Sequence, residues 1–254
     1  MISKNQIKQI QTLHLKKNRD AHKLFLAEGI NTVKELIKKK SNCIKELYLT
    51  ESFLASNLES IQSNKITHYI ISESELKKIS LQISPNNVLA ICNYLERTDT
   101  KLNFESGFSL YLDDIRDPGN FGTIIRLADW YGISLIYCSP DSCDFYNPKV
   151  IQASMGAFLR VNVLHSTLAN VIKNSNVKNV YGAVLNGQNI YKEKLSNGII
   201  VIGNEANGIS KENLNLITHP ISIPSHPESD AESLNAAMAS SIIVSEFYRQ
   251  LAIS

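Results

Sequence analysis

Apolar residues in the second half of the chain form short continuous runs separated by segments with helical spacing. The runs predict strands at 108–112, 134–138, 160–163, 179–184, 199–202 and 219–223. Helices are predicted near 120–131, 148–156, 167–175 and 210–216, and a long last helix from about 232 to 251. Wholly apolar strands that alternate with helices indicate an α/β fold with a mostly parallel sheet, covered on both faces.

The first half shows a smaller α/β pattern over residues 24–95. Apolar spacing predicts helices around 33–37 and 54–61, and strands at 44–49, 69–71 and 88–94. Phe25 to Gly29 leads into the first of these helices, and Ser72 to Glu75 matches a capping box that begins another helix. Residues 98–106 are polar and lack periodicity, so we predict a linker between a domain at 1–97 and a domain at 107–254.

Charge is distributed unevenly, although the net charge of the 254 residues is only +2. Residues 1–100 contain 15 Lys and Arg against 10 Asp and Glu, whereas the rest of the chain is acidic on balance. The first 23 residues hold one acid, Asp20, and a basic cluster of Lys4, Lys8, Lys16, Lys17, Arg19 and Lys23. Such a cluster is typical of a phosphate-binding surface or of a solvated terminus, and charge alone does not decide between them.

Several classes of protein do not fit this sequence. No apolar run approaches the roughly 18 residues of a membrane span, and the polar, basic start is unlike a secretory signal. The four cysteines, Cys43, Cys92, Cys138 and Cys143, form no C-x-x-C pair and have no histidine at metal-ligand spacing. We therefore expect reduced thiols, no metal site and a cytoplasmic location.

Polar loops follow three of the predicted strands, and parallel strands end at one edge of a sheet, where ligands bind. After the strand at 108–112, Asn120 is a candidate helix N-cap beside Gly119 and Gly122. Arg126 then lies in an apolar helical segment, where an arginine either reaches to solvent or meets an acidic partner or ligand.

The second loop, after 199–202, places Glu205 between Gly203 and Gly208, which is typical of backbone that approaches a ligand closely. The third loop joins Pro224 to a helix that starts with small residues, and Ser233 could simply cap that helix. None of the loops has the glycine pattern of a nicotinamide or ATP site, which argues against an oxidoreductase.

Taken together, the three loops resemble the three motifs of the SpoU/TrmH family of RNA ribose methyltransferases. The first motif resembles Asn120-x-Gly122-x-x-x-Arg126, the second Gly203-Asn204-Glu205-x-x-Gly208, and the third Ile223-Pro224 followed by Ser233-Leu234-Asn235. Residues 149–157 also match the usual segment between the first two motifs. The resemblance covers about residues 108–250.

This resemblance implies a deep trefoil knot that pattern reasoning alone would not propose, since knots are nearly absent from proteins. It implies that the knotted domain holds S-adenosylmethionine. The residues expected to hold this cofactor are Leu185, Asn186, Gly187, Ile202, Gly203, Asn204, Ile223, Pro224 and Leu234. One departure is the loop at 225–232, which is longer and more acidic than the usual link.

The resemblance also implies a reaction, methyl transfer to a ribose 2′-hydroxyl, and a homodimer with its active site at the subunit interface. The expected catalytic residues are Arg126, Asn120, Glu205, Asn235 and Ser233. Because an arginine stays protonated, Arg126 is either an unusual base or a clamp for phosphate and developing negative charge. Alternatives are a member that binds RNA with little catalysis and a methyltransferase acting on a base nitrogen.

The N-terminal half resembles the substrate-binding domain of the same family, a small α/β fold like that of certain ribosomal proteins. Lys16, Lys17 and Arg19, with the segment Phe25 to Gly29, carry this resemblance, and we predict that these three basic residues bind RNA. A separate domain favours recognition of folded ribosomal RNA over transfer RNA, which stays an alternative.

Overall fold

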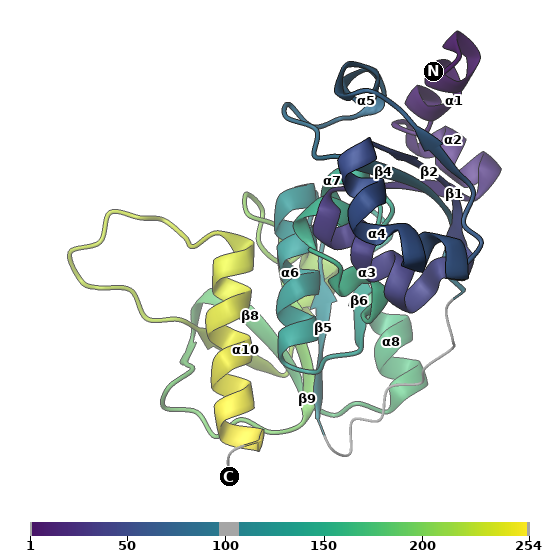
Figure 1. Cartoon of the computed structure of the whole chain (residues 1–254). Coiled ribbons are helices and arrows are strands. Elements are labelled where there is room, and N and C mark those ends of the chain that lie inside the picture. Colours follow the sequence, from purple (N-terminus) through teal and green to yellow (C-terminus); the bar gives the residue numbers. More distant parts are fainter. Residues whose placement is uncertain (1, 97–106, 253–254) are drawn as a thin grey trace. The chain divides into compact units, whose positions relative to one another are not determined.

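The computed structural model describes residues 2–96 and 107–252, which form two compact units with one sheet each (Figure 1). The first unit, here the N-terminal unit, contains the described residues up to 96 together with Asp144–Leu159. The second, here the C-terminal unit, contains 107–143 and 160–252. The predicted linker at 98–106 lies outside the described residues.

The N-terminal unit is a four-stranded sheet with helices around it. Its elements are α1 (Lys4–Thr12), α2 (Lys16–His22), β1 (Leu24–Glu28), α3 (Ile30–Lys40), β2 (Ile44–Leu49), α4 (Glu51–Ser63), β3 (His68–Ile70), α5 (Glu73–Ile79), β4 (Val88–Asn93) and α7 (Pro148–Ala153). The strand order is β1-β4-β2-β3, with β3 parallel to β2 and the other pairs antiparallel. A core of aliphatic side chains from α1, α5, β1 and β4 supports α1 against α5.

Two features of this unit differ from the sequence prediction. Phe25 to Glu28 form strand β1, paired with β4, and do not merely lead into a helix. Two helices, α1 and α2, precede β1, and α1 begins with a capping box between Ser3 and Gln6. The capping box predicted at Ser72 and Glu75 is confirmed at the start of α5.

The segment Asp144–Leu159 belongs to the N-terminal unit by its contacts, whereas the sequence grouped it with residues 107–254. Aromatic packing explains this placement. The ring of Tyr146 stacks on Tyr94 at 3.8 Å and lies 4.9 Å from Phe25, and Phe158 lies 5.9 Å from Phe25. Local apolar spacing gives no information about which sheet such rings will meet.

The C-terminal unit is a six-stranded parallel sheet with the order β10-β8-β9-β5-β6-β7. Its elements are β5 (Phe108–Leu112), α6 (Pro118–Trp130), β6 (Leu135–Cys138), β7 (Asn162–His165), α8 (Leu168–Ser175), β8 (Val180–Asn189), β9 (Gly198–Ile202), α9 (Lys211–Leu214), β10 (His219–Ser222) and α10 (Ala236–Ala252). The predicted strands and the parallel sheet are therefore confirmed, with small shifts at their ends.

Helices cover both faces of this sheet. Successive side chains of a strand point to opposite sides, so each face has apolar side chains for a helix to cover. Val180 of β8 joins a core with Leu168 and Val171 of α8. Its neighbour Tyr181 meets Phe247 of α10 on the other face, at 4.8 Å. Helix α10 lies beside α6 (Figure 1). Among the described residues, no helix is both long and apolar enough to cross a membrane.

Candidate active site

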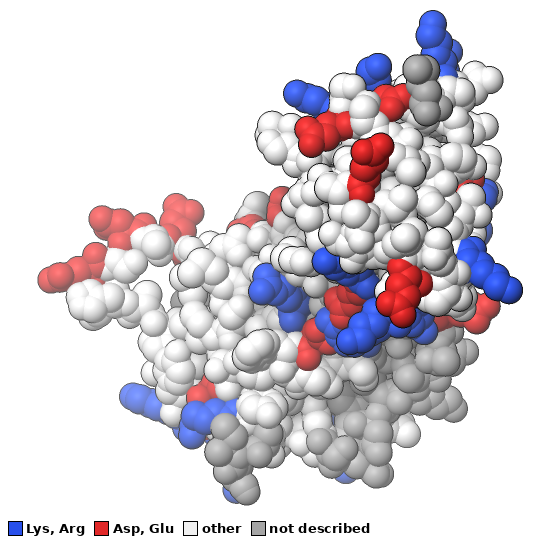
Figure 2. Space-filling view, in the orientation of Figure 1, with Lys and Arg blue, Asp and Glu red and all other residues white. Residues whose placement is uncertain are grey.

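The three polar loops lie at one edge of the large sheet because β8, β9 and β5 are parallel neighbours and β10 pairs with β8. The first loop follows β5 and the second follows β9, so they come from adjacent strands. The third follows β10 and runs to the start of α10 as an extended loop, on which acidic side chains gather (Figures 1 and 2).

Helix α6 starts earlier than predicted. Its N-cap is Asp117, whose carboxylate accepts the backbone N–H of Asn120 at 2.7 Å, and Pro118 takes the first helical position. The expectation that Asn120 caps this helix is therefore wrong. The pair Asp117-Pro118 carried the missed signal, since an aspartate cap followed by proline is a common helix start.

With its backbone fixed by this cap, Asn120 joins the three loops through its side chain. Its amide nitrogen donates a short hydrogen bond to a carboxylate oxygen of Glu205 in the second loop. Its amide oxygen accepts a hydrogen bond from the Asn235 side chain of the third loop, at 3.0 Å. The structure thus brings together three of the residues that the sequence placed in the catalytic set.

The direction of these hydrogen bonds follows from the start of α10. The side-chain oxygen of Asn235 accepts the backbone N–H groups of Ala237 and Met238, at 2.9 and 3.3 Å. Asn235, and not Ser233, therefore caps this helix. Because its oxygen is used, its NH₂ group faces Asn120, which in turn points its own NH₂ group at Glu205.

The second loop is closed on itself and tied to the first. Asn204 and Gly208 exchange backbone hydrogen bonds, and the Asn204 side chain donates to the Asp114 carbonyl at 2.8 Å. A side chain at Gly203 would overlap the backbone of Gly208 and Ile209. The glycine that sequence analysis assigned to ligand approach is therefore required by the loop's own packing.

Two buried polar side chains lie in β5 and at its end, and one of them, Asp113, holds the backbone that follows the second loop. The Asp113 carboxylate is buried and accepts the backbone N–H of Ser210 at 2.8 Å. Burial, and secondarily the nearby Asp113, raises the pKa of Tyr111 to about 12. Tyr111 therefore keeps its proton and donates to the Ser166 carbonyl at 3.1 Å.

The backbone of β8 opens where the cofactor residues were predicted. Gly182 is paired with Pro220 of β10, but the next pair joins Gln188 to Ile221, so residues 183–187 have no residue opposite them on β10. Gly187 fits against the backbone of Ile221, which a side chain would overlap. Leu185 is 72% exposed, and Asn186 is exposed beside it.

This edge has the character that an adenosine-like group requires. Leu185 in β8 and, at 43% exposure, Leu234 in the third loop present apolar surface to solvent, where a flat ring could cover them. The unopposed backbone of 183–187 offers N–H and C=O groups for polar contacts. Ile202 is buried in the sheet, Ile223 is half-buried, and Pro224 is exposed.

Arg126 and Ser233 do not join the cluster of Asn120, Glu205 and Asn235. Six residues beyond Asn120, Arg126 lies about 120° around the helix from it. It is exposed and has no hydrogen bond or ion pair with any described residue of its own chain. It shares its helix face with Trp130, which is 84% exposed. Ser233 is exposed in the loop before α10.

The three basic residues predicted to bind RNA differ in their surroundings. Lys16 and Lys17 are exposed at the start of α2. Arg19 is only 2% exposed, and its guanidinium donates to the Leu13 and His14 carbonyls and pairs with Asp144 at 2.7 Å. A guanidinium used in this way holds the fold together, and its burial leaves Arg19 little surface to offer RNA.

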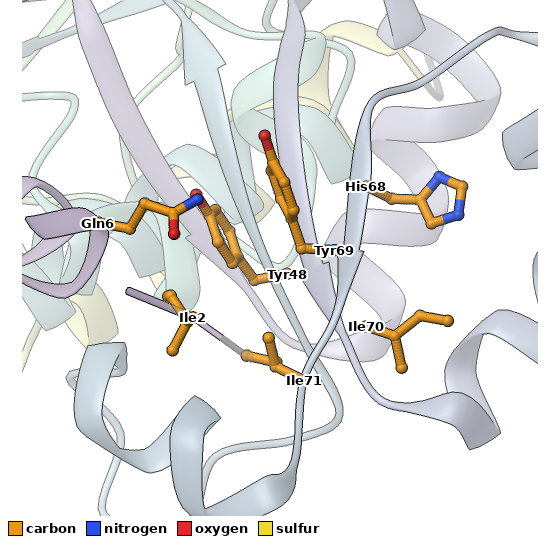
Figure 3. A pocket seen from close by; sticks show the side chains of 7 residues that line it. All are labelled: Ile2, Gln6, Tyr48, His68, Tyr69, Ile70 and Ile71. Carbon is orange, nitrogen blue, oxygen red and sulfur yellow. The ribbon is translucent and has the colours of Figure 1, made fainter. Parts of the chain in front are cut away.

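A cavity of about 320 Å³ lies elsewhere, in the N-terminal unit, between α1 and strands β2 and β3 (Figure 3). It is lined by Ile2, Gln6, Tyr48 and residues 68–71, and the rings of Tyr48 and Tyr69 are stacked at 5.1 Å. In the part of the chain that the structure describes, no cluster of His, Cys, Asp or Glu could hold a metal ion.

An open parallel sheet with glycine-containing loops and linked polar side chains at its carboxyl edge is typical of α/β proteins that bind a ligand at that edge. Comparison with known families is more specific. Residues 107–245 match the SpoU rRNA Methylase family, and residues 4–90 match the MRM3-like substrate binding domain. The chain belongs to the SpoU methylase family.

Individual relatives agree over nearly the whole chain. The 23S rRNA (guanosine(2553)-2'-O)-methyltransferase RlmP of Bacillus subtilis is 30% identical over 251 residues, 95% of this chain and 96% of the relative. A TrmH-family protein from Porphyromonas gingivalis has a similar structure, with 33% identity, a TM-score of 0.84 and coverage of 98% and 99%. An AdoMet-bound rRNA methyltransferase from Sinorhizobium meliloti has 26% identity, a TM-score of 0.84 and coverage of 99% and 97%.

Proposed function

We propose that this protein transfers a methyl group from S-adenosylmethionine to a ribose 2′-hydroxyl of ribosomal RNA. The observation that carries the proposal is the hydrogen-bonded series Asn235–Asn120–Glu205, which joins the three loops that match the family's motifs. The name of the Bacillus subtilis relative supports both the acceptor atom and the choice of ribosomal over transfer RNA.

The cofactor would lie against the carboxyl ends of β8, β9 and β10 and supply a methyl group made electrophilic by its sulfonium. Its holding residues are Leu185, Asn186, Gly187, Ile202, Gly203, Asn204, Ile223, Pro224 and Leu234. In this proposal the C-terminal segment is knotted around that site. The match of residues 107–245 to the SpoU rRNA Methylase family supports this part of the proposal.

The side chains of the site act by binding and orientation. The hydroxyl proton would pass to solvent water as the new carbon–oxygen bond forms, because a guanidinium has no free lone pair to accept it. Arg126 holds the phosphate next to the target ribose and stabilises negative charge that develops on the 2′-oxygen. Asn235 fixes Asn120, and Asn120 fixes the Glu205 carboxylate, which pairs with an arginine brought to it.

That arginine comes from a second copy of the chain, because Arg126 faces away from Asn120 in its own chain. The face of α6 that carries Arg126 also carries the exposed Trp130, and the neighbouring α10 exposes Met238 and Tyr248. Large exposed apolar side chains on adjacent helices are typical of an interface. A homodimer formed on this face completes the site. We also propose a cytoplasmic location, which is consistent with the similarity to a bacterial ribosomal RNA methyltransferase.

Substitution of Arg126 by lysine tests whether the planar guanidinium, and not only a positive charge, is needed to hold the phosphate. A guanidinium that holds phosphate through two parallel hydrogen bonds is not replaced by an ammonium. We therefore expect Arg126→Lys to lower kcat about 100-fold while calorimetric titration gives unchanged binding of S-adenosylmethionine. Near-full activity of this variant would contradict the role proposed for the planar group.

Deleting the gene and mapping 2′-O-methyl groups across ribosomal and transfer RNA tests the function as a whole. Loss of one ribosomal site, restored by the wild-type gene, is expected. Loss at a transfer RNA site would favour that substrate, and loss of a base methyl group would assign the reaction to a base nitrogen. Unchanged methylation everywhere, with no binding of S-adenosylmethionine by the purified protein, would leave a binding protein without catalysis.

A further inference from the structure

The loop between α5 and β4, residues 80–87, carries the most exposed large apolar side chain among the described residues. Ile83 is 95% exposed, and Leu81 in the same loop is 47% exposed. A single exposed aliphatic side chain needs no explanation, but two on one projecting loop form an apolar tip. This feature lies in the N-terminal unit and is not used by the site described above.

Both ends of the loop are held by hydrogen bonds, so the tip is presented on a fixed base. Glu28 of β1 is buried, and its carboxylate accepts the Ser80 hydroxyl and the backbone N–H of Leu81, the latter at 3.1 Å. At the other end, the carbonyl of Asn87 accepts the backbone N–H of Thr50 at 3.0 Å. A fixed base lowers the entropy lost when the tip meets a partner.

The last turn of α5, next to the loop, is basic, whereas the acids Glu73 and Glu75 lie in the first turn of that helix. The last turn of α5 carries the exposed Lys77 and Lys78. Residues 76–95 contain no Asp or Glu. Helix α1 joins this region because the Gln11 side chain donates to the Lys78 carbonyl at 2.8 Å. The one carboxylate at the loop's base, Glu28, is occupied by the hydrogen bonds described above.

We propose that this loop is a nucleotide-contact surface, at which an unstacked base of the RNA substrate lies against Leu81 and Ile83 while Lys77 and Lys78 bind its phosphates. Proteins read RNA mostly where bases are splayed out of the helix. Aliphatic side chains such as Leu and Ile contact base faces where proteins wedge between the base steps of DNA, and Leu81 and Ile83 can do the same to an unstacked base. Lys77 and Lys78, which follow Glu73 and Glu75 along α5 and lie at the end nearer the loop, complement the polyanion. The inference rests on the proposed function, since it assigns the substrate a second contact.

The cavity of Figure 3 is a weaker candidate for the same role, although two tyrosines line it. The Tyr48 hydroxyl already donates to Glu46 at 2.7 Å, and the Gln6 side chain accepts the backbone N–H of Ser3 at 3.0 Å. The Glu46 carboxylate beside Tyr48 also disfavours a phosphate group, because both are negatively charged. Tyr69, a partly exposed ring on this cavity, therefore provides a matched control.

Direct binding and methyl transfer would be measured with the full chain and unmodified large-subunit ribosomal RNA transcribed in vitro. The variant Leu81→Ser/Ile83→Ser should weaken RNA binding and raise KM about tenfold, while kcat stays within about twofold of wild type. The dependence of RNA affinity on salt concentration should not change in this variant. The variant Lys77→Gln/Lys78→Gln should reduce the salt slope by roughly 1 to 2. Tyr69→Ser should change neither quantity.

Unchanged RNA affinity of Leu81→Ser/Ile83→Ser would overturn the inference, as would an equal loss in Tyr69→Ser. A changed oligomeric mass with unchanged RNA affinity would make the loop a protein contact and would overturn it too. The single variant Ile83→Ser changes only a solvent-exposed side chain, so it folds normally and serves as the test if the double variant fails to fold. Failure of the proposed function would look different from failure of this inference. In that case the wild-type protein itself would transfer no methyl group, whatever the loop binds.

Discussion

Asn120 uses both ends of its side-chain amide, and this single residue links the loops after β5, β9 and β10. The helix cap made by Asn235 sets the direction of both hydrogen bonds. An amide is therefore required at position 120, because it must accept from one neighbour and donate to the other. A carboxylate of nearly the same shape cannot do both.

We predict that Asn120→Asp lowers the free energy of unfolding by about 1 kcal/mol at neutral pH, since it removes a donor and sets two carboxylates side by side. Like charges raise the pKa of such a pair above that of the unfolded chain. The penalty is therefore largest at neutral pH and falls as the pH drops toward about 4 to 5. Urea denaturation across this range measures it.

The variant Asn120→Ala is the control for charge, because it loses the hydrogen bonds to Glu205 and Asn235 without adding a carboxylate. Its destabilisation should not depend on pH in this range. Equal pH dependence in the two variants would contradict the contact between residue 120 and Glu205.

At the scale of elements, α2 is attached to the segment Asp144–Leu159 by a buried ion pair. Arg19 extends from α2 to Asp144, which begins that segment, and also donates to the carbonyls that end α1. Lys17 lies two residues away on the same short helix but is exposed. Neighbouring basic residues thus have separate tasks, one within the fold and one at the surface.

Arg19→Met should lower the free energy of unfolding by about 3 kcal/mol, because it leaves Asp144 without its buried partner. Lys17→Met should leave stability unchanged and reduce the affinity for ribosomal RNA. Urea denaturation and filter binding on both variants separate the two tasks. Comparable loss of RNA affinity in a folded Arg19→Met protein, with full stability, would keep Arg19 in the RNA-binding set.

The loop after β9 supplies a second element-scale prediction. Gly203→Ala places a methyl group into the backbone of Gly208 and Ile209. It should cost about 1–3 kcal/mol of stability and weaken the binding of S-adenosylmethionine in calorimetry. Gly107→Ala is the control, since a side chain there meets no atom. Unimpaired stability and cofactor binding in Gly203→Ala would contradict the close packing of this loop.

For the whole molecule, the position of Arg126 on an exposed helix face predicts an active site built from two chains. In a mixture of Arg126→Ala and Asn120→Ala proteins, a mixed dimer contains one site with both residues intact. Two inactive variants should therefore recover about a quarter of wild-type methyl transfer after mixing in equal amounts, as expected for a twofold dimer.

Trp130→Glu introduced into both variants should abolish this recovery, because a charge replaces an exposed anchor of the proposed interface. Sedimentation would follow the dimer in parallel. No recovery from mixed dimers that do form would place Arg126 and Asn120 of one site on the same chain.

Much of the C-terminal fold was predictable because its information is local. Continuous apolar runs such as 108–112 and 199–202 mark buried parallel strands, and the polar loops after them marked the correct edge of the sheet. The N-cap of α6 at Asp117 is also a local feature, carried by the pair Asp117-Pro118, although Asn120 is a residue type that fits an N-cap equally well. Strand β1 was harder, since Phe25 to Glu28 is short and is defined by its pairing with β4.

The sequence by itself determined the alternation of strands and helices, the edge at which the polar loops gather and the family to which those loops belong. Only the tertiary structure decided that Asn235 caps α10 while holding Asn120, that Arg19 is buried against Asp144, and that Ile83 is left in solvent. The physical reason is distance along the chain. Propensity and periodicity act over a few residues, whereas burial, charge pairing and the direction of an amide depend on residues that only folding brings together.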